Sequence, residues 1–180
     1  MKIVLVPLAN GCEEIEAVTV IDILRRAGIE VVSAGLDTHP VRASRGTVLV
    51  PDTILDVALQ RSYDMLVLPG GQPGTNNLKA DPRILTLAKN MAQHDRYVAA
   101  ICAAPSVLAT AGVLDGRRAT SFPGSLDGFP HVQQQPAAVV VDGKIITSRG
   151  PGTAMDFALT LVERLAGHAK RVEVEAGLQR

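Results

Sequence analysis

Aliphatic runs alternate with segments of helical periodicity along the whole chain, and this alternation restricts the fold more than any other feature. Continuous apolar runs such as residues 2–8, 64–69 and 97–101 are typical of strands that are buried on both faces of a sheet. Helical patterns follow such runs, for example over residues 13–28 and 81–95. The order predicts right-handed βαβ units, in which helices cover both faces of a mostly parallel sheet.

The remaining elements fit the same architecture. We expect a strand over residues 30–36, a strand pair over 41–51 and a hairpin over 137–148. We also expect a short helix over residues 104–114 and two further helices over 152–168 and 169–180. Asp81 precedes Pro82 and is expected to cap the helix that follows. No repeat or linker divides the chain, so residues 1–180 are predicted to form one doubly wound α/β domain.

Composition excludes several classes of function. Lys and Arg balance Asp and Glu at 18 each, without a basic run, and aromatic residues make up 3%, so a nucleic-acid or anionic-membrane partner is not expected. No apolar run approaches the roughly 18 residues that a membrane span needs. The opening residues resemble a first strand rather than a signal peptide. Two cysteines are too few for a disulfide framework, and we expect a reducing, cytoplasmic setting.

Ligands of doubly wound sheets bind at the carboxyl ends of the strands, where Cys102 follows the run over residues 97–101. A cysteine at such a strand-to-helix corner projects from a sharp turn like a nucleophile, and an adjoining helix N-terminus lowers a thiol pKa from about 8.5 to between roughly 3.5 and 7.5. The alternative is a small, buried, inert core residue. Local sequence leaves both interpretations open.

Glu16 falls on the apolar stripe of the first predicted helix. Helical spacing places it in line with Val20, Ile23, Leu24 and Ala27. A carboxyl on such a stripe tends to keep its proton, and a protonated carboxyl can donate a hydrogen bond to a thiolate or transfer protons. The alternative is an ordinary first-turn acid, which is the interpretation we prefer for Glu13, whereas Glu14 is expected to point toward solvent.

Glycines follow another predicted strand in the segment PGGQPG. Gly70, Gly71 and Gly74 let backbone N–H groups approach a ligand and could form one side of an oxyanion hole, with the N–H of Ala103 as the other side. A plain turn is the alternative explanation.

Metal and nucleotide sites are not indicated. The segment SRGPGT lacks a phosphate-binding pattern and is better explained as a capped helix start at Thr153. His39, His94, His131 and His168 form no metal-ligand spacing, and we expect neither a metal nor a cofactor. Pairing of Cys102 with His131 would depend on folding that the sequence does not show. Cys12 is either a small loop residue or a resolving thiol.

Six segments together resemble the ThiJ/PfpI superfamily, in the branch of YajL and the Parkinsonism-associated protein deglycase; they are GCEEIEAV, RRAGI, ASRG, VLPGG, AAICAAP and TSRGPGTAMDFAL. The resemblance covers nearly the whole chain and implies a flavodoxin-like sandwich and a homodimer. It assigns Cys102 to the functional cysteine of the nucleophile elbow and Glu16 to the protonated acid beside it. It also assigns Gly70 and Gly71 to the oxyanion loop, and Arg45 to the dimer contact and active-site mouth.

Two positions depart from other branches of this superfamily. Phe122 stands where some members carry a catalytic histidine, and Ala103 stands where the protease-like branch has one directly after its cysteine. Both differences argue against peptidase activity and against a Cys–His–Glu triad. Cys12 occupies a position where relatives commonly have Ala or Ser.

These observations support two functional hypotheses. The first is a cofactor-independent glyoxalase or deglycase acting on methylglyoxal-type 2-oxoaldehydes or their early amine and thiol adducts, with Cys102 as nucleophile and Glu16 as proton shuttle. The second is a redox-responsive stress protein or chaperone in which Cys102 is oxidised to sulfinate. A glutamine amidotransferase is excluded because the chain lacks a downstream His-x-Glu.

Overall fold

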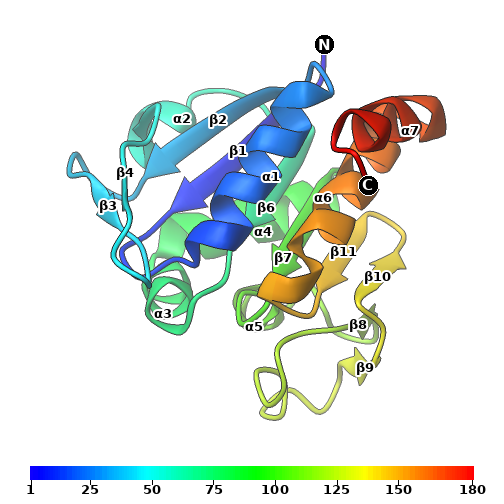
Figure 1. Cartoon of the computed structure of the whole chain (residues 1–180). Helices are drawn as coiled ribbons and strands as arrows, with labels where there is room; N and C mark the ends of the chain where they lie inside the picture. The colour runs from blue at the N-terminus through cyan, green and yellow to red at the C-terminus, as the bar shows by residue number, and fades with distance from the viewer.

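A seven-stranded sheet with the order β10-β11-β7-β6-β1-β2-β5 forms the centre of the molecule (Figure 1). The computed structural model describes residues 1–180. The strands are β1 (Ile3–Leu8), β2 (Glu30–Gly35), β5 (Thr53–Ile54), β6 (Met65–Leu68), β7 (Tyr97–Ile101), β10 (Val139–Asp142) and β11 (Ile145–Ser148). All neighbours pair in parallel except β10 and β11, which form the expected antiparallel hairpin at one edge. The predicted doubly wound α/β domain is confirmed.

Helices cover both faces of the sheet, as Figure 1 shows. One face carries α1 (Glu14–Arg26), α6 (Ala154–Ala166) and α7 (His168–Gly177), and the other carries α2 (Leu55–Ala58), α3 (Gln72–Ala80), α4 (Pro82–Gln93) and α5 (Pro105–Thr110). A hydrophobic core lies on each face of the sheet, and β1 contributes side chains to both. Val4 and Val6 pack with α1 and α6, whereas Leu5 packs on the opposite face. This two-sided burial explains why the strand sequences are continuous apolar runs.

Short elements complete the fold. Strands β3 (Val41–Arg42) and β4 (Val48–Leu49) form the predicted antiparallel pair, and Asp81 caps α4 by accepting from the Arg83 N–H at 2.9 Å. Strands β8 (Arg118–Ala119) and β9 (Gln133–Gln134) pair beside the sheet, and a 3-10 turn, η1, spans Pro151–Thr153.

Two expectations about these elements need correction, and four short elements were not predicted. Helix α3 begins inside the segment that we assigned to a loop, because Pro73 is compatible with a first helical turn and Gly71 caps it. The short elements α2, β5, β8 and β9 were not expected. Thr153 lies at the start of α6 as predicted, but its hydroxyl bonds to Gly150 and Ser148 and does not cap the helix.

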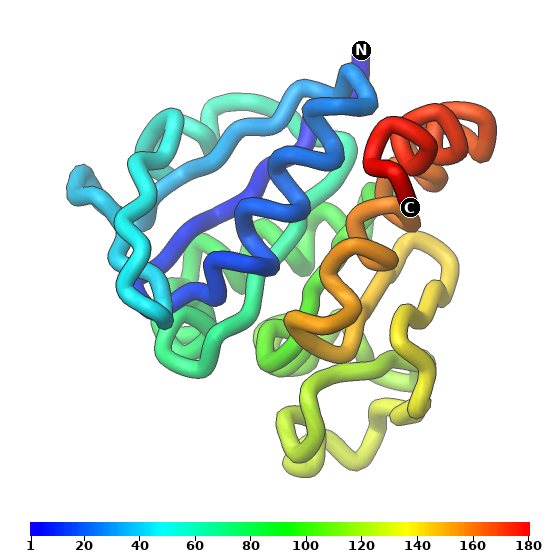
Figure 2. The backbone as a smooth tube through the Cα atoms, in the orientation of Figure 1, coloured from blue at the N-terminus to red at the C-terminus, as the bar shows by residue number.

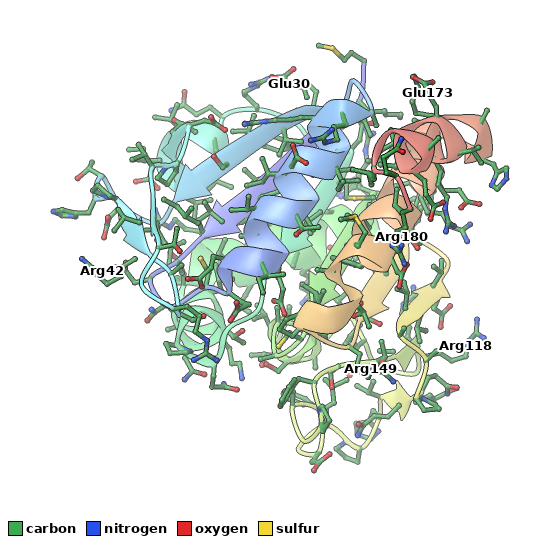
Figure 3. The ribbon with its side chains drawn as sticks, in the orientation of Figure 1. Glu30, Arg42, Arg118, Arg149, Glu173 and Arg180 are labelled. Atoms are coloured by element: carbon green, nitrogen blue, oxygen red, sulfur yellow. The ribbon has the colours of Figure 1, made fainter.

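Both termini lie at the end of the molecule away from α3 and α5 (Figure 2). Charged side chains of both signs, such as Glu30, Arg42, Arg118 and Glu173, project from separate elements at the periphery (Figure 3). None of the helices has the length and apolar character that crossing a bilayer would require.

Candidate active site

Cys102 occupies the corner between β7 and α5 in a strained conformation. Its φ angle is 64°, in the left-handed region that non-glycine residues adopt at a cost of about 1–3 kcal/mol. Two backbone hydrogen bonds hold it there, from the Cys102 N–H to the Ser148 carbonyl at 2.9 Å and from the Phe122 N–H to the Cys102 carbonyl at 2.7 Å. The residue is 8% exposed. This backbone strain is typical of functional sites rather than of inert core cysteines.

Glu16 lies in the first turn of α1 and is fully buried. Its Oε2 accepts a hydrogen bond from the Gly70 N–H at 2.7 Å. Its Oε1 makes no hydrogen bond of ordinary geometry, and the Cys102 thiol interacts with the same carboxyl. Burial raises the pKa of Glu16 to about 7, although the Gly70 N–H opposes that change. A proton on Oε1 would give this orphaned atom a donor role toward the sulfur.

The pKa of the Cys102 thiol is raised, whereas the sequence led us to expect a lowered pKa. Burial and the charge of an ionised Glu16 raise the pKa of Cys102 to about 12, while the N–H groups of Gly71 and Ala103 lower it. The helix that was expected to lower the pKa, α5, has only six residues. A thiolate and an ionised Glu16 therefore oppose each other, and a thiolate forms here only when Glu16 keeps a proton.

The glycine loop after β6 fits tightly between these two side chains and the loop after β1. A Cβ atom on Gly70 would lie 2.6 Å from the Cys102 Cβ and 2.7 Å from Glu16 Oε2. Gly71 has a φ of 85°, and a Cβ there would lie 2.3 Å from the Gly11 carbonyl oxygen. Gly70 thus orients Glu16, whereas Gly71 and Ala103 direct N–H groups to the sulfur. The structure brings these predicted site residues together.

A pocket of about 350 Å³ opens over the sulfur. Its lining residues are Glu13, Ser44, Arg45, Gly71, Gln72, Pro73, Cys102, Ala103, Phe122 and Pro151. Arg45 stands at its exposed rim and forms no salt bridge with any carboxylate of the chain. The polar lining thus contains an acidic residue, Glu13, and a basic residue, Arg45, and the apolar lining includes Phe122 and two prolines.

Sequence reasoning missed the roles of two acidic residues. Glu13 lines the pocket and accepts from the Ser44 hydroxyl at 2.6 Å. Glu14 does not point freely into solvent, because its carboxylate accepts from the Arg45 N–H at 3.0 Å and the Thr47 N–H at 3.4 Å. Slight burial opposes the effect, but hydrogen bonds from the N–H of Glu14 itself, from the Arg45 N–H, from the Ser44 hydroxyl and from the Thr47 N–H lower the pKa of Glu14 to about 2. Both acids anchor the β3–β4 turn that carries Arg45.

Other candidates lie apart from the sulfur. Cys12 is fully buried outside the pocket lining, its carbonyl accepts from the Ser44 N–H at 2.8 Å, and burial raises its pKa to about 11. No histidine lines the pocket, His131 included. No group of three or more His, Cys, Asp or Glu residues is arranged to hold a metal ion.

A second, larger hollow of about 570 Å³ lies where β1 and β2 end. Its polar lining residues include Asn10, Asp37, His39, Asp81 and Arg83, but neither Cys102 nor Glu16. Arg83 already bonds to Asp81 and Asp56, so this hollow offers no free cation and no nucleophile. The candidate nucleophile, Cys102, lines the smaller pocket.

The fold and site define a class of α/β proteins with a cysteine nucleophile elbow and a buried acid beside it. The chain belongs to the DJ-1/PfpI family, whose model matches residues 2–164. The resemblance to the ThiJ/PfpI superfamily is thereby confirmed.

Named relatives cover almost the whole chain. The zebrafish (Danio rerio) Parkinson disease protein 7 homolog is 42% identical over 98% of this chain and 96% of its own length. The glutathione-independent glyoxalase DJR-1.2 of Caenorhabditis elegans is 36% identical over 89% of this chain and 87% of its own. The crystal structure of Drosophila melanogaster DJ-1beta superposes with a TM-score of 0.96 at 42% identity, covering 99% of this chain and 97% of that one.

Proposed function

We propose that the protein is a cysteine-dependent, cofactor-independent glyoxalase that converts methylglyoxal-type 2-oxoaldehydes into 2-hydroxy acids. The observation that carries the proposal is the pairing of Cys102, in its strained corner, with the buried carboxyl of Glu16 whose pKa is about 7. A group with that pKa exchanges protons near neutral pH. The name of the Caenorhabditis elegans relative, a glutathione-independent glyoxalase, supports the same reaction.

In the first step, the Cys102 thiolate attacks the aldehyde carbon and forms a carbon–sulfur bond. The aldehyde oxygen becomes an oxyanion beside the N–H groups of Gly71 and Ala103. Protonated Glu16 then gives its proton to this oxygen, which completes a hemithioacetal and leaves Glu16 as a carboxylate.

In the second step, the Glu16 carboxylate removes the hydrogen of the former aldehyde carbon as a proton, and the ketone oxygen takes up the negative charge to give an enediolate. The hydroxyl proton of the hemithioacetal moves to this oxygen, and Glu16 returns its proton to the neighbouring carbon. These two transfers convert the ketone into a secondary alcohol and the hemithioacetal into a thioester. Water hydrolyses the thioester and releases the 2-hydroxy acid and the Cys102 thiol. The net reaction adds one water to the 2-oxoaldehyde.

The same residues support a deglycase reaction. An early adduct of a 2-oxoaldehyde on an amine or thiol presents the same carbon to Cys102, and displacement of the amine or thiol returns it unmodified. The deglycase reaction uses the same nucleophile as the glyoxalase reaction. Detection of the free amine or thiol released from its adduct distinguishes the deglycase reaction.

The experiment that tests the proposal measures D-lactate formed from methylglyoxal in buffer free of amines and added thiols. We expect production by the wild type and a fall of at least about 10³-fold in Cys102→Ser, because the nucleophile is lost. Cys12→Ser is the matched control, since it changes the other cysteine outside the pocket, and it should retain turnover. Turnover retained in Cys102→Ser would refute the assignment.

A second candidate is a redox-responsive stress protein or chaperone, which the same pocket favours because Cys102 faces it while Cys12 is buried elsewhere. A solved neighbour, the structure named Toxoplasma gondii DJ-1, oxidized, has a TM-score of 0.95 at 40% identity over 99% of this chain and 98% of that one. Mass spectrometry after peroxide treatment would detect two oxygen atoms added to Cys102. Oxidation without measurable aldehyde turnover would favour this candidate.

We also propose that two copies of the chain associate through the outer side of α1. Ile15 and Val18 expose apolar side chains there, and Val48 does the same on β4 in the neighbouring hairpin. Sedimentation equilibrium tests this proposal, and a monomer at micromolar concentration would contradict it.

A further inference from the structure

Phe122 is an aromatic residue left half exposed in a chain that has few of them. The sequence contains three Phe, two Tyr and no Trp. Phe157 is fully buried in the core and Phe129 packs partly against the other core, whereas Phe122 is 49% exposed. A single exposed apolar side chain is ordinary on a protein surface. Phe122 differs because its exposed ring lines the pocket over Cys102.

Hydrogen bonds fix the backbone of Phe122 next to that of Cys102. The Phe122 N–H donates to the carbonyl of Cys102 itself at 2.7 Å, and the Phe122 carbonyl accepts from the Ser125 N–H at 3.0 Å. The ring lies over Gly150, where a Cβ would stand 3.6 Å from the ring Cδ2. The ring of Phe122 is therefore packed over Gly150, and its backbone is hydrogen-bonded to Cys102. The residue is half exposed and lines the pocket.

The pocket has both polar and apolar lining residues and is larger than a three-carbon dicarbonyl requires. Its volume of about 350 Å³ lies within the range of roughly 300–1,000 Å³ that accommodates drug-sized ligands. The hydrogen-bond donors at Gly71 and Ala103 lie next to the sulfur, and the polar side chains of the lining are Glu13, Ser44, Arg45 and Gln72. Phe122 and Pro151 are apolar residues of the same lining. A bound 2-oxoaldehyde can therefore keep its oxygens at the donors while its substituent meets the phenyl ring.

We propose that Phe122 determines substrate specificity and makes the site selective for 2-oxoaldehydes with an aromatic substituent over methylglyoxal. The selection rests on the glyoxalase reaction proposed above. A phenyl substituent gains ring–ring contact with Phe122 in addition to apolar burial, and a methyl group reaches little of that surface. The preference contributed by the ring is on the order of tenfold in kcat/KM.

The turnover experiment compares phenylglyoxal and methylglyoxal in wild type, Phe122→Ala and Phe122→Leu. The ratio of the two kcat/KM values cancels differences in folding yield and active fraction. We expect this ratio to fall about tenfold in Phe122→Ala and by an intermediate factor in Phe122→Leu, which keeps an apolar side chain. Val172→Ala is the matched control, because Val172 is 50% exposed on α7 and lies outside the pocket.

A second measurement does not depend on turnover. Phenacyl chloride and chloroacetone present the same two substituents on a chloromethyl ketone; the Cys102 thiolate displaces chloride and forms a thioether. Alkylation rates at Cys102, located by peptide mass spectrometry, should show the same fall in the aromatic-to-methyl ratio in Phe122→Ala.

The outcomes separate the two proposals. An unchanged ratio in Phe122→Ala for both turnover and alkylation overturns the specificity role, whatever the activity. A changed alkylation ratio in a protein that turns over neither aldehyde supports the role of Phe122 in the pocket and refutes the glyoxalase reaction. A changed ratio in both measurements supports both proposals.

Discussion

Replacing Glu16 by Gln should remove a pH dependence of stability that this single carboxyl creates. Burial raises the pKa of Glu16 from 4.5 to about 7. Because the folded-state pKa lies above the unfolded one, the favourable contribution is complete below pH 4.5 and is lost as the pH rises through 7. At about 1.4 kcal/mol for each pKa unit, the wild type should lose roughly 2 to 3 kcal/mol of unfolding free energy between pH 5 and pH 8.

Gln at this position keeps the acceptor for the Gly70 N–H but cannot ionise, so its unfolding free energy should lack that decline. Other shifted groups lie outside the window. The pKa of Cys102 is raised to about 12, and that of Glu14 is lowered to about 2, so that the contribution of Glu14 is lost only as the pH falls below 4.5. The difference between wild type and Glu16→Gln therefore isolates the buried carboxyl.

The assay is urea unfolding at pH 5, 6, 7 and 8, with equal m-values required for the comparison. Glu173→Gln is the matched control, because it removes an exposed carboxyl that pairs with Lys170 at the surface. Its profile should run parallel to that of the wild type. Parallel profiles of wild type and Glu16→Gln over the same pH values would refute the burial of an ionisable Glu16 as described.

Two further variants test the packing around the pocket. Gly70→Ala places a Cβ 2.6 Å from that of Cys102 and should cost roughly 1–3 kcal/mol of stability in thermal unfolding. In the control Gly152→Ala, the new Cβ has no atom within 4 Å, so stability should change by no more than about 0.5 kcal/mol. Equal melting temperatures of the two variants would contradict the close contact at Gly70. Glu14→Gln weakens the hydrogen bonds that hold the turn over residues 44–47, so tryptic cleavage after Arg45 should accelerate about tenfold in a time course, and an unchanged rate would show that the turn is held by other contacts.

Features that depend on local pattern could be predicted from the sequence. The continuous apolar runs defined the main strands of the sheet, and helical spacing alone placed Glu16 on the buried side of α1. Cys102 was placed at a carboxyl strand end because the rule for parallel sheets needs only the order of elements. These inferences succeed because they rest on local features, namely continuous apolar runs, the helical period of 3.6 residues and the order of the elements.

Features that depend on contacts between distant segments could not be predicted from the sequence. Glu13 and Glu14 bind a turn about thirty residues further along the chain, and no signal in either segment specifies that pairing. Helix α3 starts after Gly71, which has a positive φ and lies against the loop after β1, where an added Cβ would collide with the Gly11 carbonyl oxygen. The direction in which the Cys102 pKa shifts depends on burial and on the charge of the nearby Glu16, and a strand-to-helix corner in the sequence reveals neither.

One proton connects the stability of this site to its chemistry. With both protons bound, Cys102 is a thiol and Glu16 a carboxylic acid, which is the form that burial favours. Loss of the first proton, near pH 7, costs folding free energy. That proton leaves Glu16, whose pKa is about 7, and not Cys102, whose pKa is raised to about 12. The titration that weakens the fold therefore also removes the protonated carboxyl that a thiolate needs beside it. The strained corner at Cys102 is a second feature of the site that costs stability.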